Sequence, residues 1–244
     1  MSVTLRDYCC CAGLGSDGYA AVGLGVSGID HEPQPDYPYP FTQGDAFAEL
    51  RSDEPEQYDA FHASWPCQAH TTAGHLRTAQ GGTSKYPDLL TPGLALLRER
   101  WSHKPWVVEN VDDRSKQVRA IMAPRPGETL IYLCGSMFGL HVQRHRLFLA
   151  NFPLRQPTCD HSRFPADPIT GRPRPWGVYH VKGDSVPAGG RTARDAEHGR
   201  QVMGSRRLLP WDKLKEGFPP AYTSHVGADL LIHLALRRRL AVAA

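Results

Sequence analysis

Residues 61–68, FHASWPCQ, form a short apolar run that stops at a proline and is followed at once by a cysteine. An apolar run bounded by proline predicts a buried strand, here 59–64, and Pro66 predicts a turn that lifts the next side chain out of the sheet. Cys67 is then expected at the C-terminal edge of a strand, where open α/β sheets bind their ligands. A thiol placed there is a candidate nucleophile, although a cysteine can equally be a small buried apolar side chain.

The composition is that of one globular α/β domain. The 244 residues suit a single domain with a small appended lobe, and 41% apolar with 22% charged residues is a globular balance. No apolar run approaches the roughly 18 residues of a membrane span, and the N-terminus lacks the basic-then-apolar pattern of a signal peptide. We therefore expect a cytoplasmic monomer with no membrane partner.

The six cysteines show no disulfide framework. Three of them stand in a row at residues 9–11, where they cannot easily bridge to one another, which indicates a reducing compartment. This triplet lacks the paired, spaced ligands that zinc prefers. Cys159 and His161 are a weaker metal hint still, because no second pair of cysteines lies nearby. We expect no metal site.

The N-terminal residues predict a nucleotide-binding βα unit. A strand at residues 3–9 leads into a turn over residues 12–15 and a short helix from about Ser16. Glycines let the backbone approach a ligand, and a helix N-terminus favours polar or anionic groups. A plain tight connection is the alternative, and the turn has no GxxxxGK phosphate-binding run.

Two aspartates follow the next two predicted strands. A strand at residues 25–30 ends in Asp30, at the place where doubly wound nucleotide sites hold ribose hydroxyls. A third strand ends at Gly44 and Asp45, after a proline-rich loop at residues 31–40. Taken alone, either aspartate could instead be a helix cap or a solvated turn residue.

The rest of the sheet is predicted to consist of three strands, at residues 106–108, 129–133 and 147–151. A helix at residues 87–101 leads into the first of them. The first of these strands ends at Glu109, and a carboxylate at the active edge of an apolar strand is costly to bury without a partner. Arg144 and Arg146 precede or begin the last strand. Alternate residues share a face, so both guanidinium groups could point into one site with Glu109.

The apolar residues Val226, Leu230 and Leu234 recur at helical spacing near the C-terminus. They predict a helix with Thr223 or Ser224 as its N-cap. We expect this helix to pack beside the first strand.

Residues 151–213 differ in character from the rest of the chain. Seven prolines and five glycines fall within 151–190, which predicts a loop-rich segment, and 151–213 holds eleven Lys and Arg against six Asp and Glu, a net charge of +5. The whole chain is only +3. Such a concentration of basic charge suits a surface for phosphates, Arg155 included, although it can also be a merely solvated surface.

The order of these motifs resembles the cytosine-C5 DNA methyltransferases. Six motifs follow one another at a spacing compatible with that family, in the order DYCCCAGLGSDG, SGID, GD, PCQ, ENV and HR. The similarity runs over residues 5–152 and again from Gly217 onward. QPDYPYPF, RHRLF and GFPPAYTSHVG are most similar to the small bacteriophage-encoded members. Other positions depart from the family pattern, namely Cys9, Cys11, Leu14, Trp65, Val142 and Ala228.

The resemblance implies a Rossmann-like α/β fold, a mostly parallel sheet with helices on both faces and a small loop-rich insert. Residues 1–150 would form the catalytic domain, 151–213 a target-recognition segment, and 214–244 a part that returns to the catalytic domain. The implied reaction transfers a methyl group from S-adenosylmethionine to carbon 5 of a flipped-out cytosine in double-stranded DNA, leaving S-adenosylhomocysteine.

The resemblance also implies roles for individual side chains. Cys67 would add to carbon 6 of the cytosine, Glu109 would bind its N3 and amino edge, Arg146 would hold its O2, and Arg144 would brace the site. The cofactor would contact Cys10, Ala12, Gly13, Asp30, Asp45, Ala46 and Pro66. The DNA would contact Gln68, Arg172, Arg174, Arg191 and Arg194.

Two alternatives stay open on the sequence alone. The short insert is compatible with the same chemistry on RNA or on a free cytidine nucleotide. Leu14, Ala228 and Trp65, which replace residues usual in the family, are compatible with a DNA-binding relative that has lost catalysis. The intact Cys67 and Glu109 argue against that second alternative.

Overall fold

The structure is a computed structural model that describes residues 2–66, 69, 87–112, 116–164, 166, 176–177 and 191–243. Its centre is a seven-stranded sheet with the order β3-β2-β1-β4-β5-β7-β6. The strands are β1 Thr4–Tyr8, β2 Gly25–Asp30, β3 Phe41–Gln43, β4 Ala60–Ser64, β5 Trp106–Val111, β6 Thr129–Leu133 and β7 Arg146–Ala150. Only β7 runs antiparallel to its neighbours.

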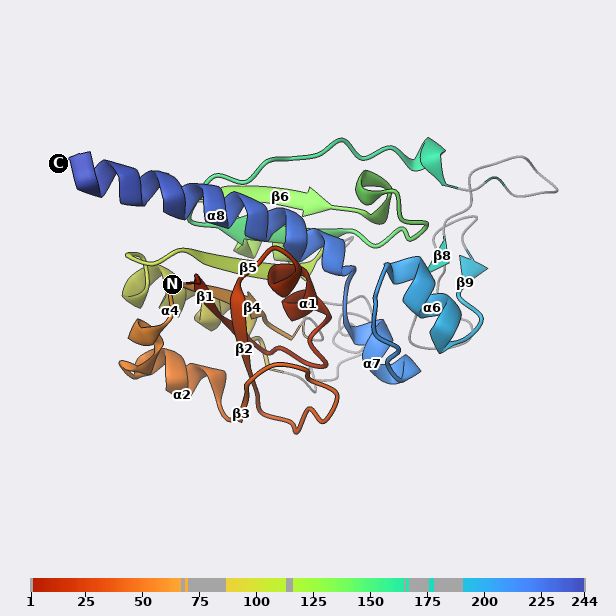
Figure 1. Ribbon diagram of the computed structural model, residues 1–244, viewed down its shortest axis with the longest axis horizontal. Coiled ribbons are helices and arrows are strands. Elements are labelled where there is room, and N and C mark those ends of the chain that lie inside the picture. Colours follow the sequence, from red (N-terminus) through yellow and green to blue (C-terminus); the bar gives the residue numbers. More distant parts are fainter. Residues whose placement is uncertain are drawn as a thin grey trace.

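Helices cover both faces of this sheet (Figure 1). One face carries α1 (Leu14–Ala21) and the long C-terminal helix α8 (Pro220–Ala243). The other face carries α2 (Ala46–Arg51), α4 (Leu90–Arg100) and α5 (Gln117–Ile121). The expected α/β architecture, a mostly parallel sheet between two layers of helices, is confirmed.

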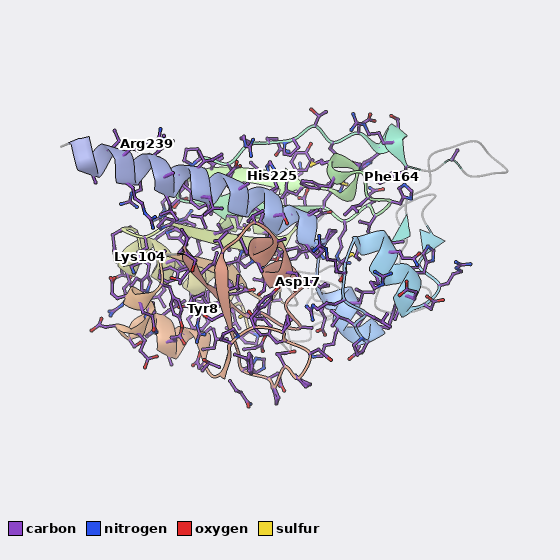
Figure 2. The ribbon with its side chains drawn as sticks, viewed as in Figure 1. Tyr8, Asp17, Lys104, Phe164, His225 and Arg239 are labelled. Atoms are coloured by element: carbon purple, nitrogen blue, oxygen red, sulfur yellow. The ribbon has the colours of Figure 1, made fainter. Side chains whose placement is uncertain are left out.

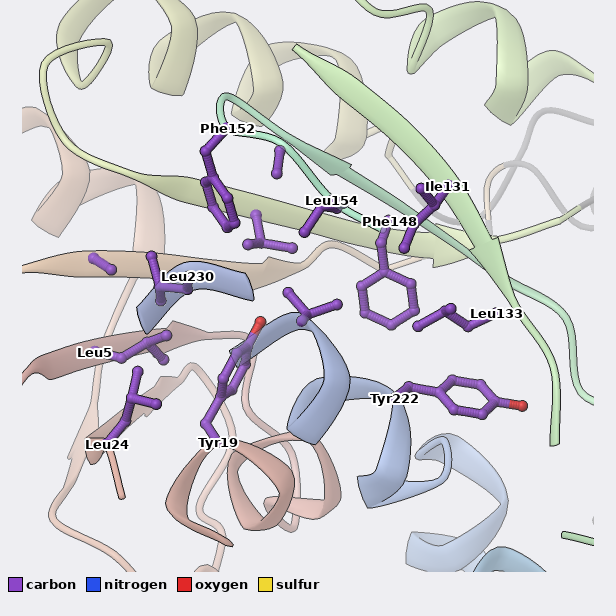
Figure 3. Close-up of a cluster of buried hydrophobic side chains, with 14 of the residues drawn as sticks. Leu5, Tyr19, Leu24, Ile131, Leu133, Phe148, Phe152, Leu154, Tyr222 and Leu230 are labelled. Atoms are coloured by element: carbon purple, nitrogen blue, oxygen red, sulfur yellow. The ribbon is translucent and has the colours of Figure 1, made fainter. Parts of the chain in front are cut away.

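The strand sequences explain why both faces are covered. In β5, Val107 packs in the core under α1 and α8, whereas Trp106 and Val108 pack in the core on the opposite side. Such near-continuous apolar strands are typical of sheets buried on both faces. Figure 3 shows the first core, where Tyr19 of α1 and Leu230 of α8 point toward side chains of the sheet.

The fifth strand is longer than the sequence predicts. It continues through Glu109 and Asn110, which pair with Phe148 and Leu147 of the antiparallel β7. The extension follows from that pairing, since the last strand runs back along the edge of β5 and satisfies its backbone groups. Glu109 therefore lies inside a paired strand rather than just beyond its end.

The predicted N-cap of the C-terminal helix is wrong. The helix α8 begins at Pro220, so Thr223 and Ser224 lie inside it. Their hydroxyls donate instead to backbone oxygens of α1, from Thr223 to Gly15 at 2.7 Å and from Ser224 to Gly18 at 3.0 Å. The side chains that suit a cap are used to join two packed helices.

The C-terminal part of the insert folds back onto the turn after β1. The described helices of this part are α6 (Ala196–Met203) and α7 (Trp211–Glu216), which continues beyond the predicted end of the insert at residue 213, and two short strands, β8 Trp176–Gly177 and β9 Arg191–Thr192, pair in parallel. Val202, Met203 and Leu214 share a small apolar core with Ala12 and with Leu14 at the start of α1. Within the described residues, no helix combines the length and the apolar character needed to cross a membrane.

The contact between α1 and α8 requires glycine at position 18. A Cβ there would lie 2.0 Å from the Pro220 carbonyl oxygen and 2.1 Å from the Thr223 hydroxyl. Alanine normally stabilises a helix interior by about 1 kcal/mol relative to glycine. For Gly18→Ala we expect the opposite sign, a loss of about 1–3 kcal/mol or more from overpacking, measured by urea unfolding.

A matched control is Gly25→Ala at the exposed start of β2, where an added Cβ meets nothing closer than 3.8 Å. That change should alter the free energy of unfolding by no more than about 0.5 kcal/mol. If Gly18→Ala were as stable as the wild-type protein, the close packing of α1 on α8 would be refuted.

Candidate functional site

The turn after β1 has the tight geometry predicted for it. Gly13 is the N-cap of α1 and has a left-handed φ of +82°. Cys9 and Cys11 are also left-handed, with φ of 59° and 47°. Glycine adopts this conformation without strain, so Cys11 occupies a position where glycine would be easier to accommodate. The backbone N–H of Cys11 donates to Asp30 Oδ2 at 3.0 Å.

Asp30 lies at the end of β2, as predicted, and its side chain is almost completely buried. Its second oxygen, Oδ1, accepts from the backbone N–H of Glu32 at 3.1 Å. A carboxylate has about four lone-pair sites, so two backbone donors orient the group and leave acceptor capacity for hydroxyls. The arrangement suits a residue that holds the hydroxyls of a ribose, and this role stays a prediction.

Asp45 has the structural role that the sequence left as its alternative. It is the N-cap of α2, and its Oδ1 accepts from the backbone N–H of Phe47 at 2.8 Å. Ala46 is the first residue of that helix and is buried. The adenine contact proposed for Asp45 has no support from this geometry beyond its position at the same edge of the sheet.

The three consecutive cysteines lie in a largely buried setting. Burial raises the pKa of Cys9, Cys10 and Cys11, and the charge of Asp30 raises the pKa of each further. Without a cation beside them, these thiols keep their protons and behave as small apolar side chains.

The structure fixes the chain immediately before the candidate nucleophile. Cys67 and Gln68 themselves lie outside the described residues. Asn110 Nδ2 donates to the carbonyl oxygen of Trp65 at 2.9 Å, and the buried Trp65 ring packs so closely on α4 that a Cβ at Gly93 would lie 2.4 Å from it. Pro66 therefore follows a carbonyl that the ENV motif holds in place. The Trp65 ring thereby anchors this turn in the core.

Glu109 and Arg146 form a buried ion pair in this part of the sheet. Arg146 Nε lies 3.2 Å from Glu109 Oε1, and the Glu109 side chain is 8% exposed. Burial raises the pKa of Glu109, and the positive charges of Arg146 and Arg144 with a hydrogen bond from Ser64 offset part of that rise. Arg144 donates to the Lys215 carbonyl. The positive charges of Arg144 and Arg146 thus both act on the Glu109 carboxylate, as predicted from the alternate spacing of the two arginines.

A chain of buried polar side chains that was not predicted leads to Glu109. The Tyr19 hydroxyl hydrogen-bonds His62 Nδ1 at 2.9 Å, and His62 Nε2 hydrogen-bonds Ser64 Oγ at 2.9 Å. Ser64 pairs with Glu109 across β4 and β5 and hydrogen-bonds its carboxylate. Burial lowers the pKa of His62 to about 3, so its ring is neutral. The signal in the sequence was His62 and Ser64 at alternate positions of an apolar strand.

A second buried polar group lies under the β1–α1 turn. Burial raises the pKa of Asp7 to about 7, although Ser16 donates a hydrogen bond to its carboxylate. Ser16 also hydrogen-bonds the Tyr37 hydroxyl at 2.8 Å. Tyr37 belongs to the QPDYPYPF segment and packs against Gly13, so the loop after β2 covers the turn. The charges of Asp30 and Glu109 also raise the pKa of Asp7.

Arg207 joins the end of the insert to the same turn. Its guanidinium donates to Asp17 Oδ2 at 2.9 Å, to the Ala12 carbonyl at 2.6 Å and to the Asp36 carbonyl at 2.8 Å. Figure 2 shows Asp17 on α1, on the side that faces α7. This contact was not predicted, because nothing in the sequence distinguishes Arg207 from the other basic residues of the insert.

The predicted DNA-contacting residues are only partly described. Arg172 and Arg174 lie outside the described residues, and Arg191 is known only as the first residue of β9. The backbone N–H of Arg194 donates to His198 Nδ1 at 3.3 Å, before α6. Arg155 has a structural partner that was not expected, since its Nε pairs with Asp229 Oδ1 of α8 at 2.5 Å. That ion pair ties the start of the insert to the core.

The raised pKa of Asp7 predicts a pH-dependent stability. Between its ordinary pKa of 3.8 and about 7, the folded chain holds a proton that the unfolded chain releases, so this contribution to stability falls as pH rises through that window. Asp7→Asn is neutral throughout and still accepts from Ser16. Relative to wild type, its free energy of unfolding should increase from pH 4 to pH 7, by at most about 4 kcal/mol. Urea titrations across this range test the prediction, and parallel pH profiles would contradict it.

Several solved structures share the fold of this chain. S. pombe Dnmt2 methyltransferase matches with a TM-score of 0.57 and 11% identity, over 96% of this chain and 99% of that one. Entamoeba histolytica methyltransferase EhMeth matches with a TM-score of 0.58 and 11% identity, again over 96% and 99%. A Spodoptera frugiperda DNMT2 mutant matches with a TM-score of 0.56 and 13% identity, over 94% and 100%. No protein-family model matches the sequence, and no curated protein matches it significantly. The chain therefore has the Rossmann-like α/β fold of these methyltransferases.

Proposed function

We propose that this protein is a methyltransferase that uses S-adenosylmethionine to methylate carbon 5 of cytosine in double-stranded DNA. The observation that carries the proposal is the buried Glu109–Arg146 pair, with Arg144 beside it, next to the strand that leads into Cys67. The shared fold adds support, since the similar solved structures are methyltransferases. The ordered motifs of the sequence supply the choice of cytosine carbon 5.

The residues at the β1–α1 turn fit the proposed cofactor. Asp30 is a buried carboxylate with unused acceptor capacity, held by the N–H of Cys11 beside the left-handed Gly13. Such a carboxylate at the end of the second strand is the usual partner of ribose hydroxyls in doubly wound folds. When bound there, S-adenosylmethionine supplies an electrophilic methyl group on a sulfonium. Gly13 and Ala12 would line its methionine end.

Cys67 carries the covalent step of the proposal. Carbon 5 of cytosine is a poor nucleophile, and addition of the Cys67 thiolate to carbon 6 makes it enamine-like and able to take the methyl group. Removal of the carbon-5 proton then expels the thiolate and restores the aromatic ring. A free cysteine has a pKa of about 8.5, so only a few per cent is ionised near neutrality. In the proposed site, a nearby positive charge such as that of Arg146 would favour the ionised form.

Glu109 is suited to act as an acid in this step. Because burial raises its pKa, the carboxyl keeps its proton to a higher pH than an exposed glutamate. A protonated Glu109 can donate to N3 of the base and stabilise the charge that develops as sulfur adds. Arg146 uses Nε on Glu109 and Nη1 on the His145 carbonyl, at 2.8 Å. A guanidinium has five donors, so others remain for the cytosine O2.

A smaller substrate is the second candidate. Arg207 holds the end of the insert against the β1–α1 turn, and Arg155 is paired with Asp229. The contacts of Arg207 reduce the part of an already short insert that could read a DNA sequence. Transfer of tritiated methyl groups to DNA, RNA and dCMP in separate reactions decides between these substrates. Labelling of dCMP alone would refute the DNA proposal.

Cys67→Ala should abolish methyl transfer and leave cofactor binding largely intact, because the thiol acts on the base and other strands hold the cofactor. A radiolabel transfer assay and titration calorimetry measure the two effects. DNA with 5-fluorocytosine at the target should trap the wild-type protein as an adduct on a denaturing gel, since fluorine cannot leave as a proton does. Substantial turnover by the alanine variant would exclude Cys67 as the nucleophile.

Glu109→Gln should slow the chemical step by about 10²–10⁴ and weaken DNA binding much less, because the side chain supports charge that develops only during addition. Single-turnover kinetics and DNA titrations separate the two quantities. Glu128→Gln is the matched control, because Glu128 forms a similarly buried pair with Arg98 at 2.6 Å. That control should leave the chemical step unchanged. Equal losses in rate and binding for Glu109→Gln would reduce Glu109 to a base-binding residue.

A further inference from the structure

Two cysteines and two histidines converge beside β6 and β7. Cys134 follows β6, His145 precedes β7, and Cys159 and His161 come from the segment after β7, where His161 begins the 3-10 helix η4 (His161–Arg163). One ligand atom from each of these four side chains lies within 4.8 Å of the other three. Among the described residues, this is the one group of His, Cys, Asp or Glu side chains close enough together to share a metal ion.

The distances within this group match those of a tetrahedral zinc site. Cys159 Sγ lies 3.2 Å from His161 Nε2 and 3.6 Å from His145 Nε2, and Cys134 Sγ lies 3.5 Å from His161 Nε2. Zinc bonds of about 2.3 Å to sulfur and about 2.0–2.1 Å to nitrogen, arranged tetrahedrally, separate sulfur from nitrogen by about 3.5 Å. Both imidazoles present Nε2, and each nitrogen lies within this distance of a sulfur.

The burial of the group also suits a structural site. Cys134 is completely buried, and His145, Cys159 and His161 are partly buried. Two thiolates whose sulfur atoms lie within 4.8 Å of each other repel unless a positive charge lies between them. A divalent ion would supply that charge.

We propose that Cys134, His145, Cys159 and His161 bind one zinc ion in a structural site. Two thiolates and two imidazoles form a donor set that zinc prefers, and four protein ligands leave no open position for water or substrate. The site is distinct from the proposed catalytic residues. Its role would be to fasten the segment after β7 to the ends of β6 and β7.

Sheet register explains why the sequence alone did not indicate this site. Leu133 and Arg146 are paired across the antiparallel β6 and β7, so the next residues outward, Cys134 and His145, face each other. The other two ligands of the group, Cys134 and His145, thus come from two segments that are distant in sequence from Cys159 and His161. Only one of these two ligands is a cysteine. The sequence-based expectation of no metal site rested on a search for a second pair of cysteines.

The test measures metal in the full-length protein, purified under reducing conditions without chelator. We expect about one zinc per chain by mass spectrometry, and after exchange with Co²⁺ the absorption of a tetrahedral ion with thiolate-to-cobalt charge-transfer bands. Cys159→Ser and His161→Asn should each bind zinc at least about tenfold more weakly in competition with a chromogenic chelator. Cys159→Ser should also weaken the charge-transfer bands, because one thiolate is lost.

Two matched controls separate the site from general effects of the same substitutions. Cys11→Ser removes a thiol of the β1–α1 turn, and His103→Asn removes an exposed imidazole that pairs with Glu56 at 2.7 Å. Both should keep zinc and the cobalt spectrum. The spectrum of the wild-type protein keeps the proposal testable even if a ligand variant does not fold.

Three results would overturn the proposal. The first is wild-type protein that contains no zinc and shows no tetrahedral cobalt spectrum. The second is zinc that stays bound when Cys134 and Cys159 are both changed to Ser. The third is a disulfide between Cys134 and Cys159 in the reduced preparation. Metal content is measured without any methyl transfer. The outcome is therefore independent of the proposed activity.

Discussion

Glu109 is the buried charge on which the arrangement of this edge of the sheet depends. A carboxylate inside an apolar sheet is tolerated only where partners compensate the loss of water. Here Arg146 reaches it from the antiparallel β7, two residues before Phe148, the register partner of Glu109, and Ser64 contributes a hydroxyl from β4. The reversal of β7 is what makes this possible, because it brings the residues before the strand to the same end of the sheet as the last residues of β5. Topology and electrostatics therefore require each other at this point.

Most of the framework was predictable from the sequence because it depends on local pattern. Apolar runs bounded by glycine or proline predicted the strands. The position of Asp30 at the end of the second strand predicted that it lies beside the glycine turn. Predictions failed where a side chain's partner is distant in sequence. Thr223 was expected to cap its own helix but bonds to Gly15, and the pairing of Arg155 with Asp229 was not foreseen. A polar residue on its own does not reveal which distant group will satisfy it.

The same limit explains the residues of the site that were missed. His62 and Ser64 looked like members of an ordinary buried strand, and only the pairing of β4 with β5 shows that they lead from Tyr19 to Glu109. Arg207 acquires its importance from Asp17, with which it forms a salt bridge across nearly the whole chain. Both cases arise from tertiary pairing, which composition and periodicity do not contain.

Arg144, His145 and Arg146 are consecutive, yet their side chains have different partners. Arg146 pairs with Glu109, whereas His145 lies against Cys159. Neighbouring residues of an extended chain point to opposite sides, so this division depends on strand phase. A shift of β7 by one residue against β5 and β6 would exchange the imidazole and the guanidinium and would disrupt both groups in a single event. One strand register therefore holds two separate clusters of polar side chains in place.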